Sequence, residues 1–591
     1  MRDVIIVGAG AGGPVVAAEL AGRGLDVLLL EAGAHATRPG EVWSHFEDDA
    51  NNPLTGYFRF GPSARAERAW FRELPQNSFI WQSAGVGGTT LHYYGNCPRP
   101  YPGAFAGYDQ PDKSAYDTAH LFPFTYRELV PYLEWIEAVL PVQTAALGTK
   151  EVVFLGGAET LGIPLQKTKD TVGFAYRPQE NAILQPGGNA GRTTDSARLR
   201  YPQATGCTMC GHCFQGCVQP IAAPRNLIAK RSTANSYVPM ALTADVWAAQ
   251  GEAITLIPDA YAVRVHTELR EGEPVATGVT WRLTRTGEYQ REDAQVIVLA
   301  GGCTENPRLW FNSGLPNPND WVGRGCTDHD FDAVVGLFDR DTEASKGPGS
   351  SARCDFPGHG GLELVGLPPG LQGFALTFSD SGVPGHYTNG RGARGPWDGP
   401  AGRLVGAELK EAFRNGINRM LMVGINTDDD VEPGNRVTVS AFPADENGPV
   451  PRIRFRRRER SARTRANREF LAGQAAELLR GAGAKKVYRI DWAPILLHAQ
   501  SSMRMGRSAD DSVLDENAEA RWLRRLFVAD NSALPNSVGG ANPTATTQAL
   551  ATRTAEKIFQ KYFRGGPWIS RESPVVSTDP RISRALMDRG L

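Results

Sequence analysis

The chain has almost no net charge, few cysteines and no long apolar run. Its 63 Lys and Arg residues balance 64 Asp and Glu residues, so it carries no bulk charge that would attract nucleic acid or an anionic membrane. No apolar stretch reaches the roughly 18 residues of a transmembrane helix, and eight cysteines in 591 residues are too few for a disulfide scaffold. With 41% hydrophobic residues, the chain is long enough for several domains, or for two large ones built from interleaved segments.

The N-terminus has the pattern of a dinucleotide-binding β-α-β unit. The apolar run 4–7 predicts a buried parallel strand, and it leads directly into the glycine-rich turn 8–13. Residues 14–23 can form a helix, and a second strand over 26–30 ends at Glu31.

Each feature of that pattern has a physical reason. Gly8 permits the tight turn, Gly10 lets backbone N–H groups approach a pyrophosphate, and Gly13 allows the helix to pack closely on the strand. Glu31 ends the second strand, where a carboxylate can accept hydrogen bonds from ribose hydroxyls. The pattern predicts a dinucleotide site, but it does not separate FAD from NAD.

A second glycine-rich segment, 85–95, contains Gly87, Gly88, Thr89 and His92. Its glycine density favours a loop whose backbone approaches a ligand closely. Here the chain begins to resemble the glucose–methanol–choline (GMC) family of flavoenzymes, which place such a G-x-G-G-[ST]-[ST] segment against the flavin. The resemblance implies either that His92 packs beside the isoalloxazine or that it bonds covalently to it.

Further segments extend the resemblance over nearly the whole chain. They are the strand and turn 296–309, the segment 322–329 ending in Asp328-His329, and the Asn-Arg-Val strand at 435–439. The resemblance implies an α/β (α+β overall) fold, with a discontinuous Rossmann-like FAD-binding domain and an antiparallel-sheet substrate-binding domain. We expect the FAD domain to comprise 1–40, 78–100, 205–335 and 495–565, the substrate domain 41–77, 101–204 and 336–494, and a C-terminal surface tail 566–591. Residues 341–403 are rich in Gly and Pro and are expected to form loops that cover the active site or contact a partner.

Four cysteines fall within eleven residues, at Cys207, Cys210, Cys213 and Cys217. Their C-x2-C-x2-C-x3-C spacing is that of bacterial ferredoxins and predicts an iron–sulfur cluster. A zinc ion is the alternative to the iron–sulfur cluster, but structural zinc sites usually separate two pairs of ligand residues by a dozen or more residues. Either Cys217 joins the same cluster, as in a 4Fe-4S centre, or a 3Fe-4S cluster uses only three of the four thiolates. The resemblance is to the flavin subunits of sugar dehydrogenases that carry such a cluster, of the gluconate 2-dehydrogenase, glucoside 3-dehydrogenase and fructose dehydrogenase type.

The C-terminal segments supply the catalytic candidates. Residues 498–506 resemble the family's His-containing segment, which makes His498 the catalytic base; an imidazole can take a hydroxyl proton as hydride leaves the same carbon. Asn542 occupies the place of the His or Asn that holds the substrate hydroxyl beside the flavin. Asp530, after the closing strand, is expected near the ribityl chain, and the helix 545–559 is expected to direct its N-terminus at the flavin.

Together these features predict an FAD-dependent dehydrogenase that oxidises a CH–OH group of a sugar, glycoside or sugar acid. The cluster would pass electrons to a cytochrome, a quinone or another acceptor, with a small partner subunit. The alternatives are a pyranose-oxidase-like enzyme that uses O2, and an electron-transfer subunit without its own substrate chemistry. Because the chain opens on MRDVIIVGAG, we expect no signal peptide of its own, and therefore a cytoplasmic location or periplasmic co-export with a partner.

Overall fold

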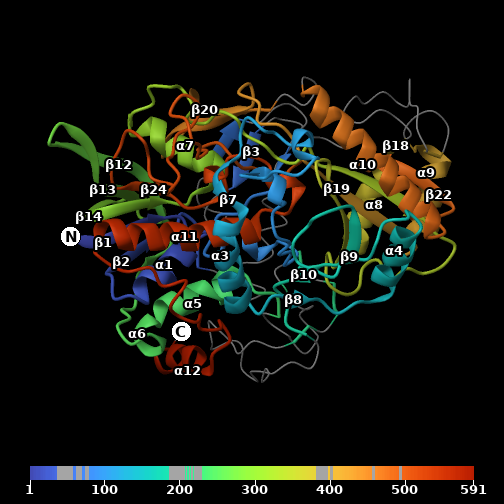
Figure 1. The fold of residues 1–591 in the computed structure, drawn as a ribbon, viewed down its shortest axis with the longest axis horizontal. Coiled ribbons are helices and arrows are strands. Elements are labelled where there is room, and N and C mark those ends of the chain that lie inside the picture. The colour runs from blue at the N-terminus through green and yellow to red at the C-terminus, as the bar shows by residue number, and fades with distance from the viewer. Residues whose placement is uncertain are drawn as a thin grey trace.

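The computed structural model places two large sheets side by side, each with its own helices (Figure 1). The parallel strands with α1 and α11 occupy the left half of the view, and the second sheet with α10 occupies the right half. The structure describes residues 1–35, 57–60, 70–73, 79–185, 206–207, 209–211, 213–214, 217, 229–380, 397–398, 404–455, 460–490 and 495–590.

The first sheet is the expected nucleotide-binding sheet. Its strand order is β11-β2-β1-β14, with β24 on the other side of β14 and the hairpin β12-β13 extending from β14. Strands β11, β2, β1, β14 and β24 run parallel, and β13 pairs with β14 antiparallel. Every core position of β1 is fully buried at Val4, Ile5 and Ile6, as expected for a strand covered on both faces. The strands are β1 Arg2–Val7, β2 Val27–Leu30, β11 Thr255–Ile257, β12 Ala260–Arg270, β13 Glu273–Leu283, β14 Tyr289–Leu299 and β24 Leu526–Val528.

Helices from distant parts of the sequence surround this sheet. Helix α1 (Gly13–Ala21) contacts α5 (Tyr237–Leu242) and α11 (Thr544–Tyr562), and α11 also contacts α3 (Tyr126–Val139). All nine residues of α1 are buried. The fold therefore joins the two ends of the chain in one core.

The C-terminal stretch is more than a surface covering. Trp568, Ile582 and Leu586 are buried in the same core cluster as β1. Helix α12 (Pro580–Asp588) packs against α5 and α6 (Ala244–Trp247).

The second sheet is antiparallel throughout, with strand order β18-β22-β15-β19-β17-β16-β9. Helix α10 (Ala462–Gly481) crosses it and contacts β15, β17, β19 and β22. Ser461 caps this helix by accepting a hydrogen bond from Thr464 N. The strands are β9 Ala175–Pro178, β15 Asp332–Leu337, β16 Ala352–Phe356, β17 Gly360–Val365, β18 Ser379–Asp380, β19 Met420–Thr427 and β22 Lys486–Ile490.

The expectation that 341–403 consists of loops was wrong over its centre. Strands β16 and β17 and helix α8 (Pro369–Thr377) lie within it, and every residue of both strands is buried. Burial in the sheet outweighs the weak local preference of these residues for strands. Residues 381–396 and 399–403 of that stretch lie outside the described part of the chain.

Smaller elements complete the architecture. A third sheet has the order β20-β21-β4-β3 and lies near α7. The remaining described elements are α4 Thr149–Glu159, α7 Gly302–Asn312, α9 Gly406–Gly416, β3 Tyr57–Phe60, β4 Trp70–Glu73, β5 Phe79–Ile80, β6 Phe105–Ala106, β7 Phe122–Thr125, β8 Gln143–Thr144, β10 Glu180–Asn181, β20 Arg436–Asp445, β21 Gly448–Arg454 and β23 Ile495–Leu496. Among the helices of the described ranges, none has the length and apolar character required to cross a bilayer.

Candidate active site

One cavity of about 880 Å³ lies where the two large sheets meet. Its walls include the residues that follow the parallel strands β1, β2, β14 and β24, so it opens at the carboxyl edge of the nucleotide sheet. The second sheet contributes Phe331, Glu363 and Met422. The lining contains these predicted site residues: Gly8, Gly10, Glu31, Gly88, Thr89, His92, His498, Asp530 and Asn542.

The glycine-rich turn after β1 is shaped by close backbone contacts. Gly8 has φ +106°, and a Cβ there would lie 2.3 Å from Ala300 O. A Cβ at Gly13 would lie 2.0 Å from Gly8 O, and one at Gly12 would lie 1.7 Å from Ala529 O. Gly10 differs, because nothing lies within 4 Å of its added Cβ. The turn therefore presents open backbone at Gly10, where a pyrophosphate can approach.

The loop around Gly87 and Gly88 closes on that same turn. Gly87 has φ +106° and Gly88 has φ +49°, and a Cβ at Gly88 would lie 2.7 Å from Gly10 Cα. Gly87 N donates to Ala9 O at 2.8 Å, and Thr233 Oγ1 donates to Gly10 O at 2.9 Å. Gly87 and Gly13 are not themselves part of the cavity lining, but their backbones pack against the turn that lines it.

Glu31 connects three turns. Its carboxylate accepts hydrogen bonds from Ala9 N at 2.8 Å, Gly33 N at 2.8 Å and Gly85 N at 3.0 Å. Burial raises the pKa of this carboxyl to about 7, against the lowering effect of those N–H groups. The predicted bond to a ribose stays a prediction, and the structure adds a role in holding the turns together.

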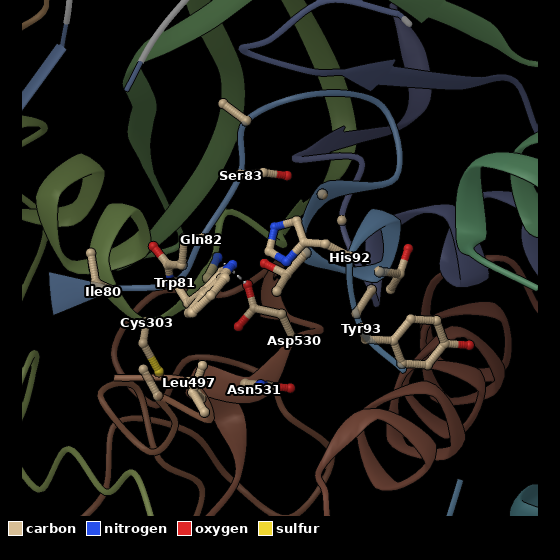
Figure 2. Close-up of a pocket in the computed structure, with 18 of the residues that line it drawn as sticks. Ile80, Trp81, Gln82, Ser83, His92, Tyr93, Cys303, Leu497, Asp530 and Asn531 are labelled. Atoms are coloured by element: carbon tan, nitrogen blue, oxygen red, sulfur yellow. Dashed lines mark hydrogen bonds between the residues drawn. The ribbon is translucent and has the colours of Figure 1, made fainter. Parts of the chain in front are cut away.

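Asp530 is held by groups from two neighbouring segments. One carboxylate oxygen accepts from Gly302 N at 2.7 Å and Asn306 Nδ2 at 2.8 Å, and the other accepts from Ser532 N at 2.8 Å. Burial raises its pKa. Figure 2 shows the side chains of Asp530, His92 and Trp81 directed toward one another in the cavity, whereas Tyr93 points away.

His92 lies in an aromatic environment. Its ring centroid is 6.4 Å from that of Trp81 and 5.8 Å from that of Phe214. The rings of Trp81 and Phe214 are in edge contact, with their centroids 4.4 Å apart. Burial and the nearby Lys230 ammonium lower the pKa of His92 to about 3, so its imidazole is neutral. Both aromatic neighbours also line the cavity.

His498 forms a hydrogen-bonded pair with His329. The two Nδ1 atoms are 3.0 Å apart, and His329 Nε2 lies 2.9 Å from Ser537 O. His498 N donates to Asp328 Oδ1 at 2.6 Å, which fixes the backbone. Burial and the positive charge of Arg353 lower the pKa of His498 to about 4, so it is a neutral base at physiological pH.

Asn542 has its amide orientation fixed by two charged side chains. Its Oδ1 accepts from Arg353 Nη1 at 3.2 Å, and its Nδ2 donates to Glu363 Oε2 at 3.1 Å. Arg353 is fully buried and pairs with Asp355 at 2.6 Å. Among the described residues no further acceptor is recorded for Asn542 Nδ2, and Asn542 lines the cavity.

Sequence reasoning missed three residues of this network: His329, Arg353 and Glu363. His329 belongs to the Asp328-His329 segment and could have been found there. Arg353 and Glu363 gave no local signal, because they lie on β16 and β17 in the stretch expected to be loops.

The four cysteines lie behind the cavity wall rather than in it. Cys213 and Cys217 are buried together with Ile183 and Ala229, and Cys207 packs against them. Met209 N donates to Cys207 Sγ at 3.4 Å. Yet within the described ranges no group of three or more His, Cys, Asp or Glu side chains is arranged to hold a metal ion.

A buried lysine links this cysteine loop to the His92 loop. Lys230 Nζ donates to Cys213 O at 2.7 Å and to the carbonyl oxygens of Leu91 at 2.9 Å and Tyr93 at 2.6 Å. Phe214, the residue after Cys213, lines the cavity. The cysteine loop therefore reaches the cavity wall through Phe214.

Comparison with known proteins identifies the family. Two family models described as GMC oxidoreductase match residues 3–331 and 432–551. The chain belongs to the GMC oxidoreductase family. It is therefore a flavoprotein oxidoreductase, and the open backbone at Gly10 and the long cavity beyond it fit FAD.

Characterised relatives share nearly the full length of the chain at low identity. The chain is 24% identical to a 2-methyl-1,2-propanediol dehydrogenase of Mycolicibacterium austroafricanum, over 95% of each chain. It is also 24% identical to the fructose dehydrogenase large subunit of Gluconobacter japonicus, over 95% of this chain and 98% of that one. Paromamine 6'-oxidase of Streptomyces fradiae is 25% identical over 94% and 91% of the two chains. These proteins act on CH–OH groups, and both dehydrogenases and oxidases occur among them.

Solved structures confirm the fold. Pyridoxine 4-oxidase from Mesorbium loti superposes with a TM-score of 0.56 at 16% identity, over 96% of this chain and 100% of that one. A formate oxidase superposes with a TM-score of 0.58 at 15% identity, over 95% and 99%.

Proposed function

We propose that the protein is an FAD-dependent dehydrogenase that oxidises a CH–OH group of a sugar derivative. The observation that carries this proposal is the arrangement of His498: a neutral imidazole on the wall of the cavity that also contains the nucleotide-binding turns. FAD, when bound, supplies the acceptor for the hydride. Asn542 provides an amide donor in the same cavity, fixed by Arg353 and Glu363.

His498 and Asn542 have different roles toward the substrate. His498 takes the hydroxyl proton as the C–H bond breaks, and Asn542 orients the hydroxyl oxygen. Gly302, Asn306 and Ser532 hold Asp530 in place in the lining of the same cavity. The intact pair His498 and Asn542 speaks against an electron-transfer subunit that lacks substrate chemistry.

The cavity favours a neutral glycoside over a sugar acid. The described lining includes no lysine, and Arg308, its one arginine there, is paired with Asp445 through a contact at 2.5 Å. A substrate carboxylate would find no free cation on these walls. Apolar side chains of α8 and the second sheet, among them Leu371, Phe374 and Met422, suit an apolar aglycone instead.

The iron–sulfur cluster of Cys207, Cys210, Cys213 and Cys217 is part of this proposal. The ferredoxin spacing and the N–H donated to Cys207 Sγ support it, because anionic cluster sulfur is stabilised by such donors. The positive charge of Lys230 near Cys213 also favours the thiolate form of that cysteine. A cluster would release electrons singly to a protein or quinone acceptor, which favours a dehydrogenase over an oxidase. A cytochrome or small subunit as partner, and either cytoplasmic location or periplasmic co-export, belong to the same proposal.

The first experiment is an anaerobic absorption spectrum of the purified holoenzyme, before and after addition of methyl and aryl glycosides, free sugars and sugar acids. We expect glycosides to bleach the flavin band. Hydrogen peroxide release in air would favour the oxidase alternative, and a flavin that no CH–OH substrate reduces would overturn the proposal. Acid precipitation of the same protein tests whether His92 is bonded covalently to the flavin, because covalently bound flavin stays with the precipitated protein.

The cluster has its own test. We expect the purified protein to contain iron and acid-labile sulfide, and Cys213→Ser to lose most of both. Cys97→Ser is the matched control, because Cys97 is an equally buried thiol in the core away from the cysteine loop. Stoichiometric zinc, or iron content unchanged in Cys213→Ser, would contradict the cluster.

The pH dependence of flavin reduction follows from the lowered pKa of His498. A base works in its unprotonated form, and a pKa near 4 keeps it unprotonated through the neutral range. The rate should therefore rise as pH increases through about 4 to 5 and stay level from about 5.5 to 8. Stopped-flow measurements across this range check it, and an acid limb centred near the ordinary histidine pKa of about 6.5 would contradict it.

A further inference from the structure

The hydrogen-bond chain behind His498 determines which of its ring nitrogens carries the proton. Three groups meet at His329: Ser537 O lies 2.9 Å from its Nε2, Gln500 Nε2 lies 3.0 Å from the same nitrogen, and His498 Nδ1 lies 3.0 Å from its Nδ1. His329 is fully buried, so water does not substitute for these partners. Its two nitrogens must therefore match their neighbours as donor and acceptor.

Ser537 O fixes the first step of this chain. A backbone carbonyl oxygen only accepts, so His329 Nε2 must carry the hydrogen. The side-chain amide of Gln500 does not oppose this assignment, because its Oε1 is buried and has no partner among the described residues. Turning that amide by 180° exchanges its nitrogen and oxygen and brings Oε1 to His329 Nε2 as a second acceptor.

The second step follows from neutrality. Burial, His498 and Arg353 all lower the pKa of His329, so its ring carries a single hydrogen, which is on Nε2. Its Nδ1 is then an acceptor, and His498 Nδ1–H must donate to it. His498 Nε2 is left with an unshared electron pair and has no hydrogen-bond partner among the described residues, while its ring lines the cavity.

We propose that His329 is the positioning residue for His498. It holds the His498 imidazole in the tautomer whose unprotonated Nε2 faces the cavity, ready to accept a proton. The inference rests on the proposed function, since it names how the base of that reaction is prepared.

The hydrogen bond between His329 and His498 also stabilises the protonated form of His498. When the substrate O–H bond breaks, its proton goes to His498 Nε2, and the C–H electron pair leaves with hydride to the flavin. The imidazolium keeps Nδ1–H, which still donates to His329 Nδ1. Asp328, whose carboxylate accepts from His498 N, and Arg353 are the other ionisable groups facing the pair. The bond between the histidines thus remains intact in both states of the base.

Two substitutions separate positioning from mere packing. His329→Leu removes the acceptor, whereas the oxygen of His329→Asn can occupy the place of Nδ1. We expect FAD-loaded His329→Leu to reduce its flavin at least about tenfold more slowly, with the acid limb shifted to lower pH because the imidazolium loses its acceptor. His329→Asn should recover most of the rate. His359→Leu is the control, because His359 is a histidine of the second sheet that pairs with Asn467, not with His498.

A readout independent of turnover decides the tautomer. Nitrogen NMR of histidine-labelled holoenzyme, with the His498 signals assigned by their loss in His498→Gln, should show a protonated Nδ1 and an unprotonated Nε2. In His329→Leu this single tautomer should become a mixture. An unprotonated Nδ1 in the unchanged protein, or a His329→Leu rate and pH profile equal to those of His359→Leu, would overturn the proposal. If no alcohol reduced the flavin at all, the proposed function would fail while the NMR result still decided the role of His329.

Discussion

Replacing His498 with Ala is expected to slow flavin reduction by about 10³-fold, within the range for loss of a general base. The variant removes a neutral imidazole of the cavity lining whose Nε2 has no hydrogen-bond partner among the described residues. Glu363 is not expected to replace it as base, because its carboxylate already accepts hydrogen bonds from Asn542 and Asn96. The measurement is single-turnover bleaching of the flavin band by a saturating substrate under anaerobic conditions.

The control for this prediction is another histidine with a partner outside the cavity. His120 pairs with Asp117 at 2.8 Å and is absent from the cavity lining, so His120→Ala should reduce its flavin at close to the unchanged rate. Both variants should retain bound FAD, because neither side chain belongs to the nucleotide turns. A His498→Ala rate within about threefold of the parent would place the base elsewhere and remove the central argument for the proposed function.

Local patterns were sufficient to predict the nucleotide-binding half of the site. The apolar run at 4–7, the turn 8–13 and Glu31 are adjacent in sequence, and each part constrains the next. Strand β1, helix α1 and strand β2 appear within one or two residues of the expected bounds. The helix expected over 545–559 is α11, and its first residue, Thr544, lines the cavity.

The substrate half depends on contacts that no local pattern contains. Arg353 and Asn542 are 189 residues apart in sequence, and Glu363 and Asn542 are 179 apart. Glycine-rich segments such as 357–361 favour loops by propensity alone, but here they form the turn between two buried strands of a seven-stranded sheet. The sheet packs against α10 through β17 and against α4 through β16, and this packing is not visible in a single sequence.

The cysteine loop illustrates a different limit. Spacing predicts which metal centre four thiols can bind, but it does not fix where their sulfur atoms lie. In the structure Cys207, Cys213 and Cys217 pack in one group of buried side chains. Within the described ranges they are not arranged as a set of metal ligands. Metal binding and folding of such loops are coupled, because the ligands must be deprotonated and brought together by the metal itself. Composition analysis of the purified protein is therefore the decisive observation.

A matched pair of glycine substitutions should separate cofactor binding from folding. In Gly10→Ala the new methyl group meets no protein atom within 4 Å, so the apoprotein should keep its melting temperature. The same methyl group occupies the space through which a pyrophosphate reaches the backbone, and FAD affinity should fall on the order of 100-fold. Fluorescence titration of the apoprotein with FAD measures this loss.

Gly12→Ala should show the opposite pattern. Its methyl group would lie 1.7 Å from Ala529 O, a backbone atom of the segment that follows β24, so the nucleotide sheet must distort to accommodate it. Such overpacking is expected to lower the free energy of unfolding by about 2 kcal/mol or more, with a corresponding loss of melting temperature in the apoprotein. If both variants lost stability equally, or if Gly10→Ala bound FAD as tightly as the parent, the turn would not be the pyrophosphate site. The two residues are separated by a single alanine, so the contrast between them reports which backbone is open to the ligand and which is closed against the protein.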